Sequence, residues 1–264
     1  MKRPHTHVFV SACLLIAMLA IPGTGGADKE NKVVPDGLRR LVRAYPTKLC
    51  GAETNTLVWC DGTRMIYDDG KKKSFEERLE KPDLEDQMSM KYPRTWSPPA
   101  PINSDPGRVR FEPFFKKMYG SSAREVQTKL DTIIWLPGVA DKKIRVTSTG
   151  GVLEKLKSVS AAILGLDRSI VDKVKKVSGA FAWRKIAGTR RLSSHSYGIA
   201  IDVGVEHADY WRWSRPGAGG LRYTNRFPLE VVEIFENHGF IWGGKWYHFD
   251  SMHFEYRPEL ILLP

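Results

Sequence analysis

The sequence predicts an α+β fold, in which helices and strands follow one another without a regular order. Segments with helical spacing of apolar residues are mixed with short alternating segments, and no regular βαβ repeat links them. No internal repeat is visible. The chain has 264 residues and is 42% hydrophobic, so it is long enough to bury a substantial core.

The first 27 residues have the layout of a secretory signal peptide. Lys2 and Arg3 precede an apolar run at 8–21, and a stretch of small residues then ends at Ala27. The run is 14 residues long, short of the roughly 20 that a membrane-spanning helix needs. Cys13 lies inside the run instead of at its end, which argues against a lipoprotein site. We therefore expect cleavage near Ala27, no stable membrane span afterwards, and a periplasmic or secreted protein.

Loss of this leader leaves two cysteines, Cys50 and Cys60. In an oxidising compartment two cysteines indicate one disulfide. A strand pattern at Thr56 to Trp59, with turn-forming residues before it, predicts a hairpin that brings the cysteines together. A pair of buried free thiols is the alternative, and zinc would need two further ligands nearby.

The chain is basic, with a formal net charge of +11. The leader carries two of the 41 basic residues and no acidic one, so 39 basic and 30 acidic residues remain after cleavage. A basic exported protein suits an anionic cell envelope, although an ordinary basic surface has the same composition. No nucleic-acid-binding motif stands out, so we expect no nucleic-acid partner.

Residues 28–120 are polar and irregular. A helix is predicted at 37–45, and a proline-rich passage at 97–107 resists long helices. The aromatic content of this part predicts a segment that packs on the main domain.

Periodicity sharpens in the main domain, at 121–264. Apolar spacing of three and four predicts helices, one beginning after a capping serine and one ending at a glycine. Alternation and β-branched residues predict strands. The predicted helices cover 122–133, 151–164 and 228–239, and the predicted strands cover 144–149, 178–183, 196–203, 240–244 and 251–256.

The strand around residue 200 carries a carboxylate that its apolar neighbours do not explain. Alternation places the β-branched residues of 199–203 on one face and Asp202 on the other, beside glycine and alanine. A buried carboxylate without a partner costs several kcal/mol, which a bound cation or a histidine would relieve. His195 reaches the same space only if the chain bends at 196–197.

A second polar group lies near the C-terminus. His253 and Glu255 share one strand face, and Asp250 joins them if the chain bends at Ser251. A lone histidine in such a strand is commonly a hydrogen-bonded core residue. Together with His195 and Asp202, however, His253 would make a three-ligand zinc site with an open fourth position, which is typical of catalytic zinc.

Two motifs carry a family resemblance. Residues 193–202 fit SxHxxGxAxD, and residues 250–253 fit DxxH followed by Phe254 and Glu255. Together they resemble the VanY-like zinc D-Ala-D-Ala carboxypeptidases and L-alanyl-D-glutamate endopeptidases, which share a fold with lysostaphin-type peptidases and the hedgehog signalling domain. The resemblance covers roughly 121–264 and implies a small antiparallel sheet with flanking helices.

By this resemblance His195, Asp202 and His253 are the Zn²⁺ ligands and Asp250 is the general base. Zinc lowers the pKa of its bound water to about 7, and a nearby carboxylate takes the proton as the peptide carbonyl is attacked. Many relatives carry glutamate at the position of Asp250. Glu255 is therefore a rival base, or else an acceptor that fixes a ligand imidazole.

The resemblance also implies an arginine that stabilises the oxyanion. Arg184, at the end of the strand before the first histidine, is the best candidate, and Arg190 and Arg191 are alternatives because the alignment there is loose.

Three residues are expected to bind substrate. Ser193 contacts a substrate carboxylate or holds the loop, His248 steadies the transition state or caps a turn, and Glu255 completes this group. The loop at 206–227 is long, aromatic and glycine-rich, which is typical of a lid or a wall beside a site, although its aromatic residues could equally pack on the N-terminal segment.

The predicted function is that of an exported zinc peptidase acting on stem or cross-link peptides of peptidoglycan. The alternative is a binding module of the same fold that keeps the metal without turnover. Asp250 argues against this alternative, because metal binding alone does not need its carboxylate. The sequence does not choose between a carboxypeptidase and an endopeptidase.

Overall fold

The structure is a computed structural model, which describes residues 33–95, 97–214 and 221–261. Residues from Val33 onward form one compact unit. The predicted leader and its cleavage site near Ala27 lie outside the described residues. No helix within the described ranges is both long and apolar enough to cross a membrane.

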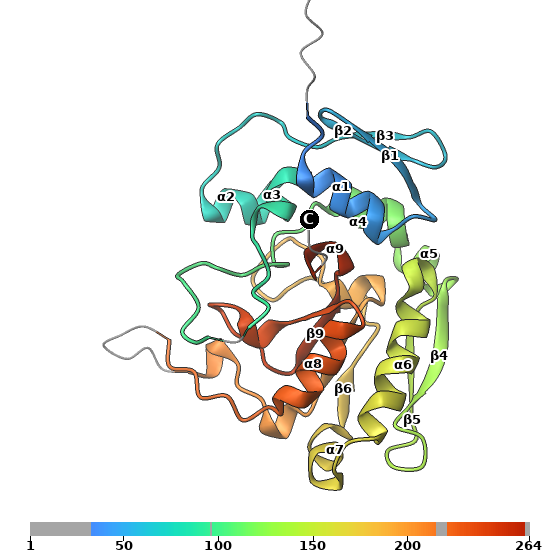
Figure 1. The fold of residues 1–264 in the computed structure, drawn as a ribbon, viewed down its shortest axis with the longest axis vertical. Coiled ribbons are helices and arrows are strands. Elements are labelled where there is room, and N and C mark those ends of the chain that lie inside the picture. Colours follow the sequence, from blue (N-terminus) through green and yellow to red (C-terminus); the bar gives the residue numbers. More distant parts are fainter. Residues whose placement is uncertain (1–32, 96, 215–220, 262–264) are drawn as a thin grey trace, which may run out of the picture. The chain divides into compact units, whose positions relative to one another are not determined.

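The N-terminal part opens with a helix and a three-stranded antiparallel sheet (Figure 1). The predicted disulfide is confirmed, since Cys50 and Cys60 are bonded across the first hairpin with their Cα atoms 4.8 Å apart. The elements are α1 (Asp36–Ala44), β1 (Leu49–Glu53), β2 (Thr56–Trp59) and β3 (Arg64–Ile66).

Four short helices follow, and the first two begin with reciprocal capping boxes. Ser74 and Glu77 cap the first of them, and Asp83 and Asp86 cap the second. The helices are α2 (Phe75–Glu80), α3 (Leu84–Ser89), α4 (Glu112–Tyr119) and α5 (Ala123–Gln127).

The helix predicted at 122–133 is wrong in its second half. It ends at Gln127, and the chain continues as strand β4 (Leu130–Trp135), which pairs with β5 (Lys142–Thr147). The run of isoleucines and an aromatic residue in β4 favours a strand once a partner is available. Helix α6 (Val152–Leu164) packs against this hairpin and against α8 (Leu229–Asn237) (Figure 1).

The remaining elements are α7 (Arg168–Val174), β6 (Val177–Gly179), β7 (Ala200–Val203), β8 (Phe240–Trp242), β9 (His253–Tyr256) and α9 (Pro258–Ile261). The four strands form the antiparallel central sheet, in the order β6-β7-β9-β8. The predicted strand at 178–183 is paired only up to Gly179, and the one at 196–203 begins as a 3₁₀ turn that occupies 194–197. The α+β class is confirmed.

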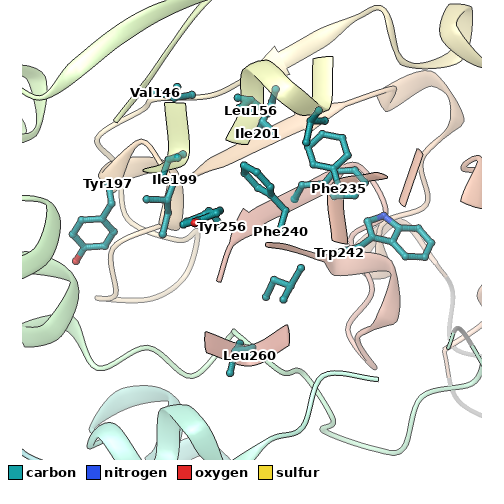
Figure 2. Close-up of a cluster of buried hydrophobic side chains, with 14 of the residues drawn as sticks. Val146, Leu156, Tyr197, Ile199, Ile201, Phe235, Phe240, Trp242, Tyr256 and Leu260 are labelled. Atoms are coloured by element: carbon teal, nitrogen blue, oxygen red, sulfur yellow. The ribbon is translucent and has the colours of Figure 1, made fainter. Parts of the chain in front are cut away.

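One face of the central sheet forms the core (Figure 2). Ile199 and Ile201 are at most 1% exposed, and Phe254 of the neighbouring strand stacks on Phe235 of α8 with ring centroids 3.8 Å apart. The β-branched residues of 199–203 thus point away from Asp202, as the alternation predicted.

The N-terminal part shares this core. Helix α1 contacts α9 at the C-terminal end of the chain (Figure 1), and Tyr45 donates a buried hydrogen bond of 2.7 Å to Glu259. Buried side chains of both parts form one continuous cluster. A separate domain beginning at residue 121 stays a prediction.

Gly198 fixes the bend that carries the chain into β7. Its φ is +67°, and an added Cβ would lie 2.7 Å from a side-chain carbon of Leu130 and 3.0 Å from the backbone nitrogen of Thr147. Gly188 has a similar φ of +77° with nothing within 4 Å of such a Cβ. Alanine substitution at the two glycines therefore separates the free-energy cost of the left-handed backbone conformation from the cost of steric overlap.

We expect Gly198→Ala to lower the free energy of unfolding more than Gly188→Ala does. The left-handed conformation costs each variant roughly 1–2 kcal/mol. In Gly198→Ala the added methyl group also overlaps atoms of β4 and β5. Chemical denaturation of both variants measures the difference, and equal losses would contradict the proposed close contact.

Candidate metal centre

Strand register brings the two halves of the predicted site together. In the β7–β9 pair Asp202 lies directly opposite His253, and Ala200 lies opposite Glu255. Directly opposed side chains in an antiparallel pair point to the same face. The face that carries the carboxylate and the imidazole is the one opposite the core.

The bend at 194–198 delivers His195 to the same face. Its Nδ1 lies 2.6 Å from the carbonyl oxygen of Ala180, a group that can only accept, so Nδ1 carries the proton. Its Nε2 lies 3.2 Å from Asp202 Oδ2. A metal-binding histidine characteristically donates its other ring nitrogen to such an acceptor.

His253 approaches the other oxygen of the same carboxylate. Its Nδ1 lies 2.9 Å from Asp202 Oδ1. Its Nε2 faces away from Asp202, 3.5 Å from Glu255 Oε2 and 3.4 Å from Ser194 Oγ. His195 thus presents Nε2 to the centre, and His253 presents Nδ1.

The three side chains fit a zinc ion. One ligand atom from each of His195, Asp202 and His253 lies within 4.8 Å of the others, and both histidines are at most 7% exposed. Tetrahedral zinc with bonds of about 2.0–2.1 Å needs ligand atoms about 3.4 Å apart, close to the spacings from Asp202 to each imidazole. Two imidazoles and a carboxylate are also a donor set that catalytic zinc uses.

Electrostatics hold this group together. Burial alone would raise the pKa of Asp202, but the two imidazoles outweigh it and keep that pKa well below its usual range. Burial likewise opposes the charged form of His253, yet its hydrogen bonds to Asp202 and Glu255 raise its pKa to about 9. The carboxylate is therefore ionised, and a metal that binds His253 near neutral pH displaces a proton.

The position of Glu255 favours the expected support of a ligand imidazole over contact with substrate. Its side chain is fully buried and does not line the cavity. Besides His253 it contacts Arg110 at 3.0 Å and Arg257 at 3.1 Å. Burial would raise the pKa of Glu255, but Arg110, His253 and Arg257 lower it well below its usual range. With three partners and no exposure to the cavity, Glu255 is less suited than Asp250 to act as the base.

Asp250 lies at the same cavity with a different environment. Its Oδ1 is buried and has no hydrogen-bond partner among the described residues. Burial raises the pKa of Asp250, and the nearby Asp202 adds to the shift. A carboxyl with a raised pKa and a free oxygen suits a general base.

The cavity contains most of the predicted site. Its wall includes the three candidate ligands, Ser193, Asp250, Arg184 and Arg191, whereas Arg190 is not part of the wall. Tyr210 and Arg212 of the predicted loop also line it, which favours a wall over packing on the N-terminal segment.

His248 does not line the cavity, which favours the expected capping of a turn over contact with the transition state. Its Nδ1 lies 2.5 Å from Asp105 Oδ2, and its backbone N–H donates to Asp105 Oδ1 at 2.9 Å. It therefore ties the turn before β9 to the N-terminal part.

Sequence reasoning missed Arg108, Arg110 and Trp246, which line the cavity as well. Both arginines come from the irregular N-terminal part, for which the sequence predicts no function. The short basic run from Arg108 to Arg110 follows a proline-rich passage, and only that run could have marked them.

The cluster of His195, Asp202 and His253 is a candidate metal centre, and the comparison with protein families places it in a peptidase-like region of the chain. Residues 187–256 match the family described as D-alanyl-D-alanine carboxypeptidase. The match spans both motifs and confirms the family resemblance, while Arg184, Arg108 and Arg110 lie outside it. No curated protein and no solved structure matches the chain.

We expect Glu255→Gln to weaken zinc binding about 10- to 100-fold, because it removes the anion that orients His253. Competition with a chromophoric chelator measures the affinity. Glu154→Gln is the matched control, since the side chain of Glu154 pairs with Lys157 on the surface, away from the cavity. Unchanged affinity in a folded Glu255→Gln protein would show that Glu255 does not support the metal.

In the metal-free protein we expect the His253 imidazole to titrate near pH 9. Asp202→Asn should lower this pKa strongly, because the burial remains while the neighbouring anion is lost. Imidazole NMR across a pH series measures both proteins. A wild-type pKa near the ordinary value of about 6.5 would contradict the close pairing.

Proposed function

We propose that the protein is an exported zinc metallopeptidase that hydrolyses a peptide bond in the stem or cross-link peptides of peptidoglycan. One observation carries the proposal: Asp250, with an unpartnered buried oxygen, lines the same cavity as the cluster of His195, Asp202 and His253. The match to a D-alanyl-D-alanine carboxypeptidase family supports the peptide substrate.

His195, Asp202 and His253 would hold the zinc through Nε2, the carboxylate and Nδ1. Zinc supplies a Lewis acid and lowers the pKa of a water molecule. The protein's own contribution is orientation. Ala180 fixes the ring of His195, and Glu255 fixes that of His253, so the ligand atoms are placed before the metal arrives.

Asp250 would move the proton. Its free Oδ1 accepts a proton from the attacking water, and the resulting carboxylic acid then protonates the leaving amine. The raised pKa helps the second half of this cycle, because it makes the protonated form easier to reach than for an ordinary aspartate.

Arg184 is favoured for stabilising the negative charge on the substrate oxygen. Its guanidinium has no partner among the described residues, whereas Arg191 pairs with Glu80 at 3.2 Å and Arg190 lies outside the wall. Ser193 donates its backbone N–H to the carbonyl of Arg184 at 3.0 Å. Ser193 thereby holds this arginine beside the cavity, in addition to lining it.

The signal-peptide pattern and the Cys50–Cys60 disulfide support export to the periplasm or the medium. The basic composition suits an anionic wall polymer. A module that only binds metal would gain nothing from burying an unpartnered Asp250, so we favour the enzyme over the binding module.

Digestion of purified peptidoglycan by the mature protein tests this function. We expect mass spectrometry to find defined peptide fragments, whose release stops with a zinc chelator and returns when zinc is added. The fragment masses identify which peptide bond is hydrolysed. No release from a verified zinc-loaded protein would overturn the proposed activity.

Two substitutions should separate metal binding from proton transfer. We expect His195→Ala to lose both zinc and activity, because it removes a ligand. Asp250→Ala should keep zinc but lower kcat at least about 100-fold, because it removes the base. Metal analysis and fragment release measure both variants, and equal loss of zinc would mean that Asp250 is itself a ligand.

A further inference from the structure

The segment at 104–110 reaches the metal centre, although it lies well before the matched family region. It supplies two arginines to the cavity wall, and they differ in how they are bonded. Arg110 donates to Gly107 O and to Glu255 Oε2, each at 3.0 Å. Arg110 is therefore committed to the support of His253.

Arg108 is held in place but not neutralised. Its Nη2 donates to the carbonyl oxygen of His248 at 2.8 Å, and its guanidinium lies 4.8 Å above the Trp246 ring. Its Nε is buried without a hydrogen-bond partner, and Nη1 has no bond to a described residue. Its side chain is 22% exposed, at the wall of the cavity.

The nearest acid does not satisfy Arg108. Asp105 Oδ2 lies 3.9 Å from Nε, beyond hydrogen-bond length. Both oxygens of Asp105 already accept hydrogen bonds from His248. Asp105 therefore fixes the segment against the turn before β9 and leaves donors of Arg108 free.

The surrounding wall is rich in guanidinium groups. Arg184 and Arg212 line the cavity without an acidic partner among the described residues, and a bound metal would add further positive charge. Among the described residues, the acids in the wall are Asp202 and Asp250, and Asp202 is occupied by the two imidazoles. Such a cavity attracts an anionic ligand.

We propose that Arg108 is a specificity-determining residue that binds a carboxylate of the substrate peptide beside the scissile bond. A guanidinium binds a carboxylate through two parallel N–H···O bonds, and stacking on Trp246 keeps the plane of Arg108 fixed for this contact. The inference rests on the proposed peptide substrate. It adds that the N-terminal part completes the site.

In a peptidoglycan stem pentapeptide with lysine at the third position, two carboxylates could fill this role: the C-terminal one and the α-carboxylate of D-glutamate. The test uses four stem pentapeptides: one with both carboxylates free, one amidated at the C-terminus, one amidated at D-glutamate, and one amidated at both. Isothermal titration measures their binding to the full mature chain carrying zinc and Asp250→Ala, which prevents turnover.

Addition of Arg108→Gln should weaken binding of the peptide with both carboxylates free about 10- to 100-fold. It should change binding of the peptide that lacks the recognised carboxylate less than about twofold. If one singly amidated peptide behaves like the doubly amidated one, the carboxylate that is amidated in it is the one that Arg108 contacts. Arg145→Gln is the matched control, an exposed arginine on β5 outside the cavity.

Equal weakening for all four peptides, or no weakening for any, would overturn the role of Arg108, and so would failure of every peptide to bind. If Arg108→Gln does not fold, Arg108→Lys keeps the charge but loses the two-bond geometry, and it should show the same selective loss. If the wild-type protein binds the acid peptides but cuts none, the proposed activity fails while the role of Arg108 stands.

Discussion

The contact of one carboxylate with two imidazoles is the constraint on which the site depends. Asp202 gives one oxygen to each of His195 and His253, and the β7–β9 register makes the second contact unavoidable. A one-residue slip of β9 would turn His253 into the core and bring Phe254 out. The aromatic packing on the core face therefore also fixes the metal-binding face.

Support for this group extends outward in layers. Glu255 holds the far side of His253, and Arg110 and Arg257 hold Glu255. These pairs are buried, so removal of one partner leaves an uncompensated charge. The outer layer joins β9 to the segment before α4, so the N-terminal part supports the metal-binding face in addition to sharing the hydrophobic core.

The sequence predicted the parts of the site that local patterns encode. Alternation around Asp202 and His253 assigns their faces, and the spacing of the two motifs matches a known family, so the sequence alone suffices to propose the candidate ligands. The helix at 122–133 failed because its isoleucines fit a strand equally well, and only pairing with β5 decides between them.

The roles of Glu255 and His248 depended on contacts that no local pattern shows. Whether Glu255 faces a substrate or an arginine is decided by Arg110, which lies 145 residues earlier in the chain. His248 likewise forms a hydrogen bond with Asp105 of the irregular N-terminal segment. Long-range partners of this kind also placed Arg108 in the cavity, where the sequence predicted no function.

The most direct test of the metal centre is zinc K-edge X-ray absorption on the zinc-loaded protein. The account predicts two imidazole ligands and oxygen ligands at about 2.0–2.2 Å, with one metal ion per chain. In Asp202→Asn the bound zinc, and with it this signal, should weaken. A spectrum without imidazole scattering, or one that Asp202→Asn leaves unchanged, would contradict the assignment of this cluster as the metal site.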